Sequence, residues 1–171
     1  MARSLDSADA SHESKRKKAN NRPEETEYRK GIGVGPARIL IPSDVGEIDY
    51  LGYSESERLL LVGEFKMVRH GFEPTFFRDD VSDFVESKKA YAKKFRKKVE
   101  WVALYLNDVV AALESEPNLP DRIDPKGMAK VLVTGFPSFA SYFIADFPCV
   151  SVVELRVAYE KQSAWPYELH C

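Results

Sequence analysis

Residues 46–66, GEIDYLGYSESERLLLVGEFK, constrain the fold of this chain more than any other stretch. The polar segment 54–57, SESE, separates two stretches with the composition of strands, so the sequence predicts a β-hairpin here. The apolar run 59–63, LLLVG, supplies residues to both faces of the second strand. That pattern is typical of a central strand that is covered on both sides.

We single out three of the charged residues in this hairpin: Asp49 in its first strand, and Glu64 and Lys66 at the end of its second. Successive strand side chains point to opposite faces, so Glu64 and Lys66 share a face and Phe65 points away from it. Charges that extend a buried strand are costly unless they are paired or bind a metal ion. We therefore predict that Asp49, Glu64 and Lys66 form a functional site.

The chain has 171 residues, which is the size of one ordinary domain. Of these residues 44% are hydrophobic and 30% are charged, a composition typical of a globular protein. No apolar run approaches the ~18 residues needed to span a bilayer. The first residues lack the apolar segment of a secretory signal. We expect a cytoplasmic, intracellular protein without membrane contact. Because the net charge is −2, the chain as a whole does not attract nucleic acid, and any such binding must come from local clusters of Lys and Arg.

Residues 1–30 are polar and charged with almost nothing apolar, which predicts a disordered or extended arm followed by one domain over residues 31–171. The basic cluster at 15–18, KRKK, is interpreted as a solvated charge run in preference to a phosphate contact. The glycine-rich segment 31–36 lacks the features of a phosphate loop. It predicts a flexible lead into a strand over residues 37–41, which Pro42 ends.

A long helix is predicted over residues 81–114, with Asp79 or Asp80 as its N-cap. Its apolar residues recur at steps of three or four and form one stripe: Tyr91, Phe95, Val99, Val102, Leu106, Val109 and Leu113. Its first half is basic, and the residues that we predict to contact a nucleic-acid backbone are Lys88, Lys89, Lys93, Lys94, Arg96 and Lys97. A solvated helical face is the alternative for these residues.

The last third of the chain alternates in type. Residues 127–134 predict a buried strand, 136–147 a short helix, 149–153 another strand and 155–162 a closing helix. A strand, a long helix, a strand, a short helix and a strand in this order predict an α/β fold in which neighbouring strands can be parallel.

This order of elements, with the pattern Asp49-x14-Glu64-Phe65-Lys66, resembles the PD-(D/E)xK nuclease superfamily, and most closely its Mrr-type and nuclease-related-domain branch. The resemblance covers residues 37–155. It implies a restriction-endonuclease-like mixed sheet flanked by helices. It also implies hydrolysis of phosphodiester bonds, with DNA favoured over RNA as the substrate.

The chemistry of the three residues agrees with this resemblance. Carboxylates such as those of Asp49 and Glu64 hold Mg²⁺, for which Mn²⁺ substitutes, and the resemblance adds the backbone carbonyl of Phe65 as a ligand. The metal would polarise the phosphate and activate a water molecule. Lys66 would position that water or stabilise charge on the phosphoryl oxygens. Glu47 is a candidate auxiliary ligand, with a rim position as its alternative.

Two alternatives stay open. One is a non-catalytic module of the same fold that binds nucleic acid or takes part in an assembly. The other is a simple ion pair between Glu64 and Lys66 in an α/β protein of another function. Family members usually carry a first helix before this hairpin, which often supplies a further glutamate. Here the preceding segment shows no apolar stripe, and Glu24, Glu25 or Glu27 could fill that role only if the segment orders against the core. The chain is therefore expected to be a trimmed fold, a part of a larger protein, or a homodimer.

Overall fold

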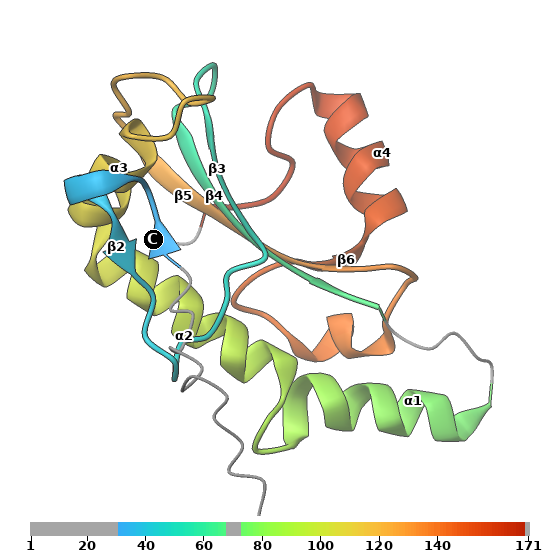
Figure 1. Ribbon diagram of the computed structural model, residues 1–171. Helices are drawn as coiled ribbons and strands as arrows, with labels where there is room; N and C mark the ends of the chain where they lie inside the picture. Colours follow the sequence, from blue (N-terminus) through green and yellow to red (C-terminus); the bar gives the residue numbers. More distant parts are fainter. Residues whose placement is uncertain (1–30, 68–72, 170–171) are drawn as a thin grey trace, which may run out of the picture.

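The protein has a mixed α/β fold in a computed structural model that describes residues 31–67 and 73–169 (Figure 1). A four-stranded sheet has the order β3-β4-β5-β6, and a separate pair joins β1 to β2. The strands are β1 (Gly31–Ile32), β2 (Ile39–Leu40), β3 (Tyr50–Ser54), β4 (Leu59–Lys66), β5 (Gly127–Thr134) and β6 (Cys149–Ser151). The helices are α1 (Pro74–Val81), α2 (Tyr91–Leu104), α3 (Leu106–Glu114) and α4 (Val152–Gln162).

The predicted hairpin is confirmed. β3 and β4 pair antiparallel, with Tyr50 opposite Gly63 and Ser54 opposite Leu59. β5 then lies parallel to β4, and β6 lies parallel to β5. Parallel neighbours require a long crossover, which here contains α1, α2 and α3. The sheet is therefore mixed, and β4, which carries Glu64 and Lys66, is an inner strand.

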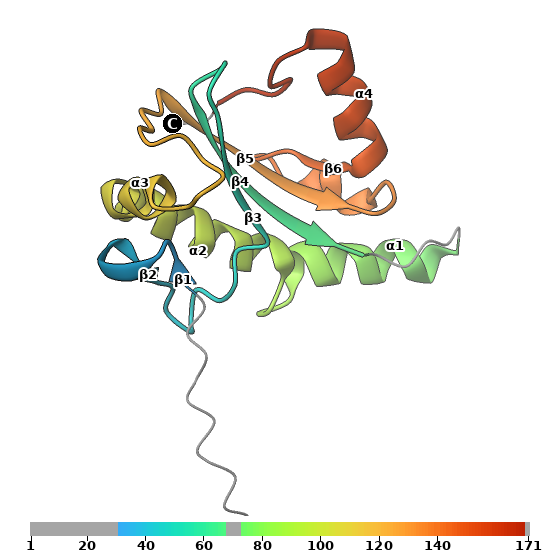
Figure 2. The same ribbon diagram turned by 45° about the horizontal axis from the view of Figure 1, so that its top comes forward.

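The helices lie on both sides of the sheet. In Figures 1 and 2, α1, α2 and α3 follow one face and α4 lies over the other. The main core forms between the sheet and α2, where Leu60 and Val62 of β4 join Phe95 and Val102 of α2, all fully or almost fully buried. The predicted apolar stripe is confirmed as the core face of α2 and α3.

The predicted single helix over residues 81–114 is wrong. A first helix, α1, begins at Pro74, a residue that suits the first helical turn, and a π-helical turn continues it to Glu86. The chain breaks before α2. Phe84 and Tyr91 lie seven residues apart, about 10 Å along a straight helix. The break brings their ring centroids to 5.1 Å in an edge-to-face contact, so packing of these rings accompanies the bend.

The segment before the hairpin is also more ordered than predicted. β1 and β2 pair antiparallel, with a 3-10 helix (Gly35–Ala37) between them. This unit docks on the end of α3, where the Gly33 amide donates to Glu116 Oε1 at 3.0 Å and the Val34 amide donates to Ser115 Oγ at 2.9 Å. The predicted flexible lead is therefore wrong, and the predicted strand is reduced to Ile39–Leu40.

Gly33→Ala is expected to destabilise the protein more than Gly35→Ala. Both glycines have a positive φ, +85° and +58°, at which alanine costs about 1–2 kcal/mol. A Cβ at Gly33 would also lie 2.7 Å from the Ala112 carbonyl oxygen, whereas a Cβ at Gly35 meets open space. Overpacking of that kind adds about 1–3 kcal/mol. Urea unfolding of the two variants measures the difference, and equal losses would contradict the docking of this unit on α3.

The last third follows the predicted order with altered boundaries. β5 spans the predicted residues, and the predicted helix over 136–147 is reduced to a 3-10 helix (Phe139–Phe143). β6 ends at Ser151 because this residue caps α4: its Oγ accepts from the Glu154 amide, and the Glu154 carboxylate accepts from the Ser151 amide. Among residues 31–67 and 73–169, no helix is long and apolar enough to cross a membrane.

Candidate functional site

The end of the hairpin brings Asp49, Glu64 and Lys66 together. Asp49 directly precedes β3, and continuing the register of Tyr50 with Gly63 places it beside Glu64. Lys66 Nζ lies 2.6 Å from Glu64 Oε1 and 3.5 Å from Asp49 Oδ2. The Phe65 amide donates to Asp49 Oδ2 at 2.9 Å, which ties this carboxylate to the end of β4. The three predicted residues therefore form one ionic cluster.

The side chains of the cluster differ in how far they are buried. The Glu64 side chain is 4% exposed, whereas those of Lys66 and Asp49 are 26% and 32% exposed. Burial alone would lower the pKa of the Lys66 ammonium. The hydrogen bond to Glu64 and the negative charges of Glu64 and Asp49 outweigh burial and raise the pKa of Lys66 above its usual value of 10.5. Lys66 is thus held charged at neutral pH.

A second lysine, Lys98 of α2, completes this cluster and was not among the predicted site residues. Its ammonium contacts Glu64 Oε2, so each oxygen of the Glu64 carboxylate has its own lysine. Its side chain is 8% exposed. Two carboxylates and two ammoniums give a formal charge of zero, which explains how Glu64 is buried so completely.

The sequence does contain a signal for Lys98. The residue follows Phe95 by three positions and precedes Val102 by four, so it lies on the apolar stripe of the helix. A lysine within such a stripe is placed to enter the core, where it needs an anionic partner. The other lysines of this segment lie off the stripe.

The cluster lies in a hollow of about 410 Å³. It is lined by Ser43, Asp44, Val45, Gly46, Glu47, Asp49, Glu64, Lys66, Tyr91, Lys94 and Lys98. The Tyr91 ring lies within cation–π distance of two ammoniums, with its centroid 5.7 Å from Lys66 Nζ and 5.9 Å from Lys94 Nζ. Glu47 therefore lies at the hollow, where its role as an auxiliary ligand stays a prediction.

The oxygen donors at the hollow suit a hard divalent cation. Within the described ranges, no group of three or more His, Cys, Asp or Glu side chains is arranged to hold a metal ion. Mg²⁺ needs fewer, because it is commonly held by one or two carboxylates and keeps several waters. The Phe65 amide faces Asp49, and a strand residue directs its carbonyl to the same edge as its amide. A cation that displaces a lysine from one Glu64 oxygen could therefore be coordinated by Asp49, Glu64 and the Phe65 carbonyl.

The predicted nucleic-acid contacts lie in two kinds of surroundings. Lys88, Lys89, Lys94 and Lys97 are exposed around the first turns of α2, and Lys94 also lines the hollow. Lys93 Nζ donates to the carbonyls of Glu86 and Ser87 at 3.0 and 3.1 Å. Arg96 forms a bidentate pair with Asp146, at 2.5 and 2.8 Å. Lys94 thus brings an exposed ammonium to the acidic cluster, and we call these four exposed lysines the basic rim.

The Arg96–Asp146 pair is expected to stabilise the protein only above acidic pH. The hydrogen bonds from Arg96 lower the pKa of Asp146 below its usual 3.8. A carboxyl with a lowered folded-state pKa contributes stability above its unfolded pKa and loses that contribution as the pH falls through the folded value. Urea unfolding of the wild type and Asp146→Asn should therefore differ at pH 6 and converge toward pH 2. A difference that does not depend on pH would contradict this account.

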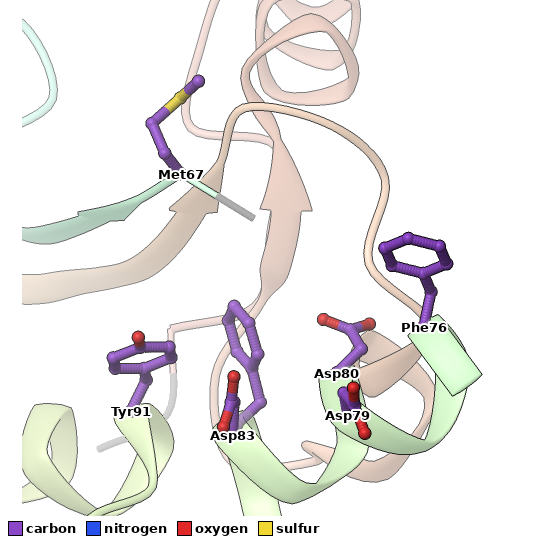
Figure 3. Close-up of a pocket in the computed structure, with 7 residues that line it drawn as sticks. Met67, Phe76, Asp79, Asp80, Asp83 and Tyr91 are labelled. Atoms are coloured by element: carbon purple, nitrogen blue, oxygen red, sulfur yellow. The ribbon is translucent and has the colours of Figure 1, made fainter. Parts of the chain in front are cut away.

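A second hollow, of about 400 Å³, adjoins the first at Tyr91 (Figure 3). Asp79, Asp80 and Asp83 line it, and they lie within α1 and the π-helical turn. The predicted N-cap role of Asp79 or Asp80 is therefore wrong. Asp80 instead accepts from Ser138 Oγ at 2.8 Å and from the Ala140 amide at 3.1 Å. It stabilises the 3-10 helix that follows β5.

Comparison of the chain with family models, curated proteins and solved structures gave no match. The predicted arm over residues 1–30 lies outside the described residues, as do the glutamates at 24, 25 and 27 that we considered as the counterpart of the family's first-helix glutamate.

Proposed function

We propose that this protein is a Mg²⁺-dependent nuclease with a restriction-endonuclease-like fold of the PD-(D/E)xK type. The observation that carries the proposal is the contact of Lys66 with both Asp49 and Glu64 at the open end of the β3–β4 hairpin. The antiparallel hairpin followed by a helical crossover and a parallel strand supports the same assignment. An ion pair between Glu64 and Lys66 alone would not account for Asp49 or for the hollow.

The residues divide the chemistry between them. Asp49, Glu64 and the Phe65 carbonyl would hold the cation, which when bound supplies Lewis acidity toward the phosphate and a nucleophile at neutral pH. Lys66 keeps its proton and presents an ammonium to the oxygens on which negative charge grows. The Phe65 amide fixes the orientation of the Asp49 carboxylate. Glu64 is oriented from both sides by lysines.

The basic rim is proposed to hold the nucleic-acid backbone. Exposed ammoniums are offered by four lysines near the start of α2, of which Lys94 lines the hollow: Lys88, Lys89, Lys94 and Lys97. Phosphates are the groups that such side chains attract. The rim compensates locally for the net charge of −2 of the whole chain. DNA is the proposed substrate, and the cytoplasm is the proposed location. The proposed partner in assembly is a second copy of the chain or a larger protein to which it belongs.

Cleavage assays test this function. Labelled duplex, single-stranded and branched DNA are incubated with the protein in Mg²⁺, in Mn²⁺ and in excess chelator. The proposal predicts products with either metal and none with chelator, on at least one of the substrates. Metal-independent products, or the absence of products on every substrate, would contradict it.

A non-catalytic nucleic-acid-binding module is the second candidate, and the contact of Lys98 with Glu64 favours it. This ammonium makes the buried cluster neutral without any metal ion, which is what a site that no longer binds metal would need. Such a module should bind DNA with an affinity that falls steeply with salt, because phosphate contacts release counterions. Strong salt dependence without cleavage in any metal distinguishes it from the nuclease.

A further inference from the structure

We propose that Lys98 acts as a built-in cation at Glu64, so that the site takes up one divalent ion and not two. The inference rests on the proposed function for the ion that enters the site. The contact between Lys98 and Glu64 itself is a property of the fold. Lys98 would be a positioning residue, because it acts through Glu64 and lies away from the reacting phosphate.

Lys98 is fixed in place by its surroundings. It is buried on α2 between Phe95 and Val102, which are both fully buried. Its ammonium reaches the Glu64 carboxylate from the side of the helix. Moving it away from Glu64 without unpacking α2 would leave a charge unpaired in the core, which is strongly unfavourable. We therefore expect Lys98 to remain at Glu64 Oε2 whatever binds in the hollow.

Lys66 differs from Lys98 in its position, its exposure and its number of partners. It is at the end of a strand, its side chain is 26% exposed, and it is shared between Glu64 Oε1 and Asp49 Oδ2. Its ammonium can shift toward solvent and still have water as a partner. An incoming cation would therefore take the oxygens that Lys66 now contacts and leave those that Lys98 contacts.

The number of ions follows from this asymmetry. In two-metal sites, ions about 3.5–4 Å apart share their carboxylate ligands. Lys98 contacts Glu64 Oε2, so a second ion could bind that oxygen only beside a buried ammonium or by displacing it. The positive charge of Lys98 also repels any cation beside Glu64, and its removal should strengthen cation binding. One bound ion with Lys98 in place is the arrangement that the cluster supports.

Calorimetric titration with Mn²⁺, without nucleic acid, tests the inference on the full chain. The wild type should bind one equivalent. Lys98→Met should bind Mn²⁺ roughly tenfold more tightly or accept a second equivalent, because a repelling charge has been removed. Lys98→Arg keeps the charge and should behave as the wild type. Lys161→Met makes the same change in net charge at an exposed residue of α4 and should leave the affinity within about twofold, since exposed charges are screened.

Two outcomes would overturn the inference: two equivalents bound by the wild type, or equal Mn²⁺ affinities in Lys98→Met and Lys161→Met. Circular dichroism establishes that each variant is folded, and Lys98→Gln replaces Lys98→Met in the comparison if the latter is unfolded. Binding by Lys98→Met but not by the wild type would contradict both the single bound ion and the metal-dependent function, and would leave only the repulsion of cations by Lys98. Absence of binding in every variant would overturn both.

Discussion

Glu64→Ala is expected to lower the free energy of unfolding by about 3–5 kcal/mol, the usual cost of removing one partner of a buried ion pair. Glu64 is 4% exposed and contacts Lys66 and Lys98. Lys66 can turn to solvent or to Asp49 when the carboxylate is lost. Lys98 cannot, so its ammonium would remain buried without a partner. The loss should therefore come mainly from Lys98.

Chemical denaturation of a double-mutant cycle tests this attribution. The double variant Glu64→Ala/Lys98→Met should recover a large part of the stability, because it leaves no unpaired charge in the core. Asp49→Ala, which removes the more exposed carboxylate of the same cluster, serves as the matched control and should cost less. Additive losses for Glu64→Ala and Lys98→Met would contradict a direct contact between the two residues.

Lys66→Met is expected to reduce the rate of metal-dependent cleavage by roughly 10²–10³-fold, the usual effect of removing one group that stabilises developing charge. Stability should change far less than in Glu64→Ala, because Glu64 keeps Lys98 as a partner and Lys66 is partly exposed. Single-turnover cleavage and urea unfolding on the same preparations measure the two effects separately.

Lys161→Met is the control for this substitution. Lys161 is an exposed lysine at the end of α4, which covers the opposite face of the sheet from α2 (Figure 2). The Lys161→Met variant should cleave DNA at the wild-type rate. A rate for Lys66→Met that matches Lys161→Met would remove Lys66 from the reaction and favour the non-catalytic module.

The hairpin and the grouping of Asp49, Glu64 and Lys66 could be predicted because local sequence determines both. Alternation along one strand puts Glu64 and Lys66 on the same face, and a short polar turn returns the chain so that Asp49 lies beside them. β5 was equally predictable, because residues 127–134 form a short apolar run with Lys130 as its one charged residue.

Local sequence does not determine the contact of Lys98 with Glu64 or the shape of the helical crossover, because both depend on tertiary packing. The periodicity of apolar residues continues across the break before α2, so it gives no sign that Phe84 and Tyr91 meet edge to face. Likewise, Gly33 and its neighbours carry little apolar periodicity. Their order comes from hydrogen bonds to Ser115 and Glu116, far along the chain.

The most direct test of the nuclease site is single-turnover cleavage in Mg²⁺ by the wild type and by Asp49→Asn. Asparagine keeps an oxygen that accepts from the Phe65 amide, so the fold of the hairpin is preserved while the charge that would bind the ion is lost. The proposed site predicts cleavage by the wild type and a loss of roughly 10²-fold or more in Asp49→Asn, the scale seen when a charged group of the reaction is removed. Equal cleavage by both proteins would contradict it.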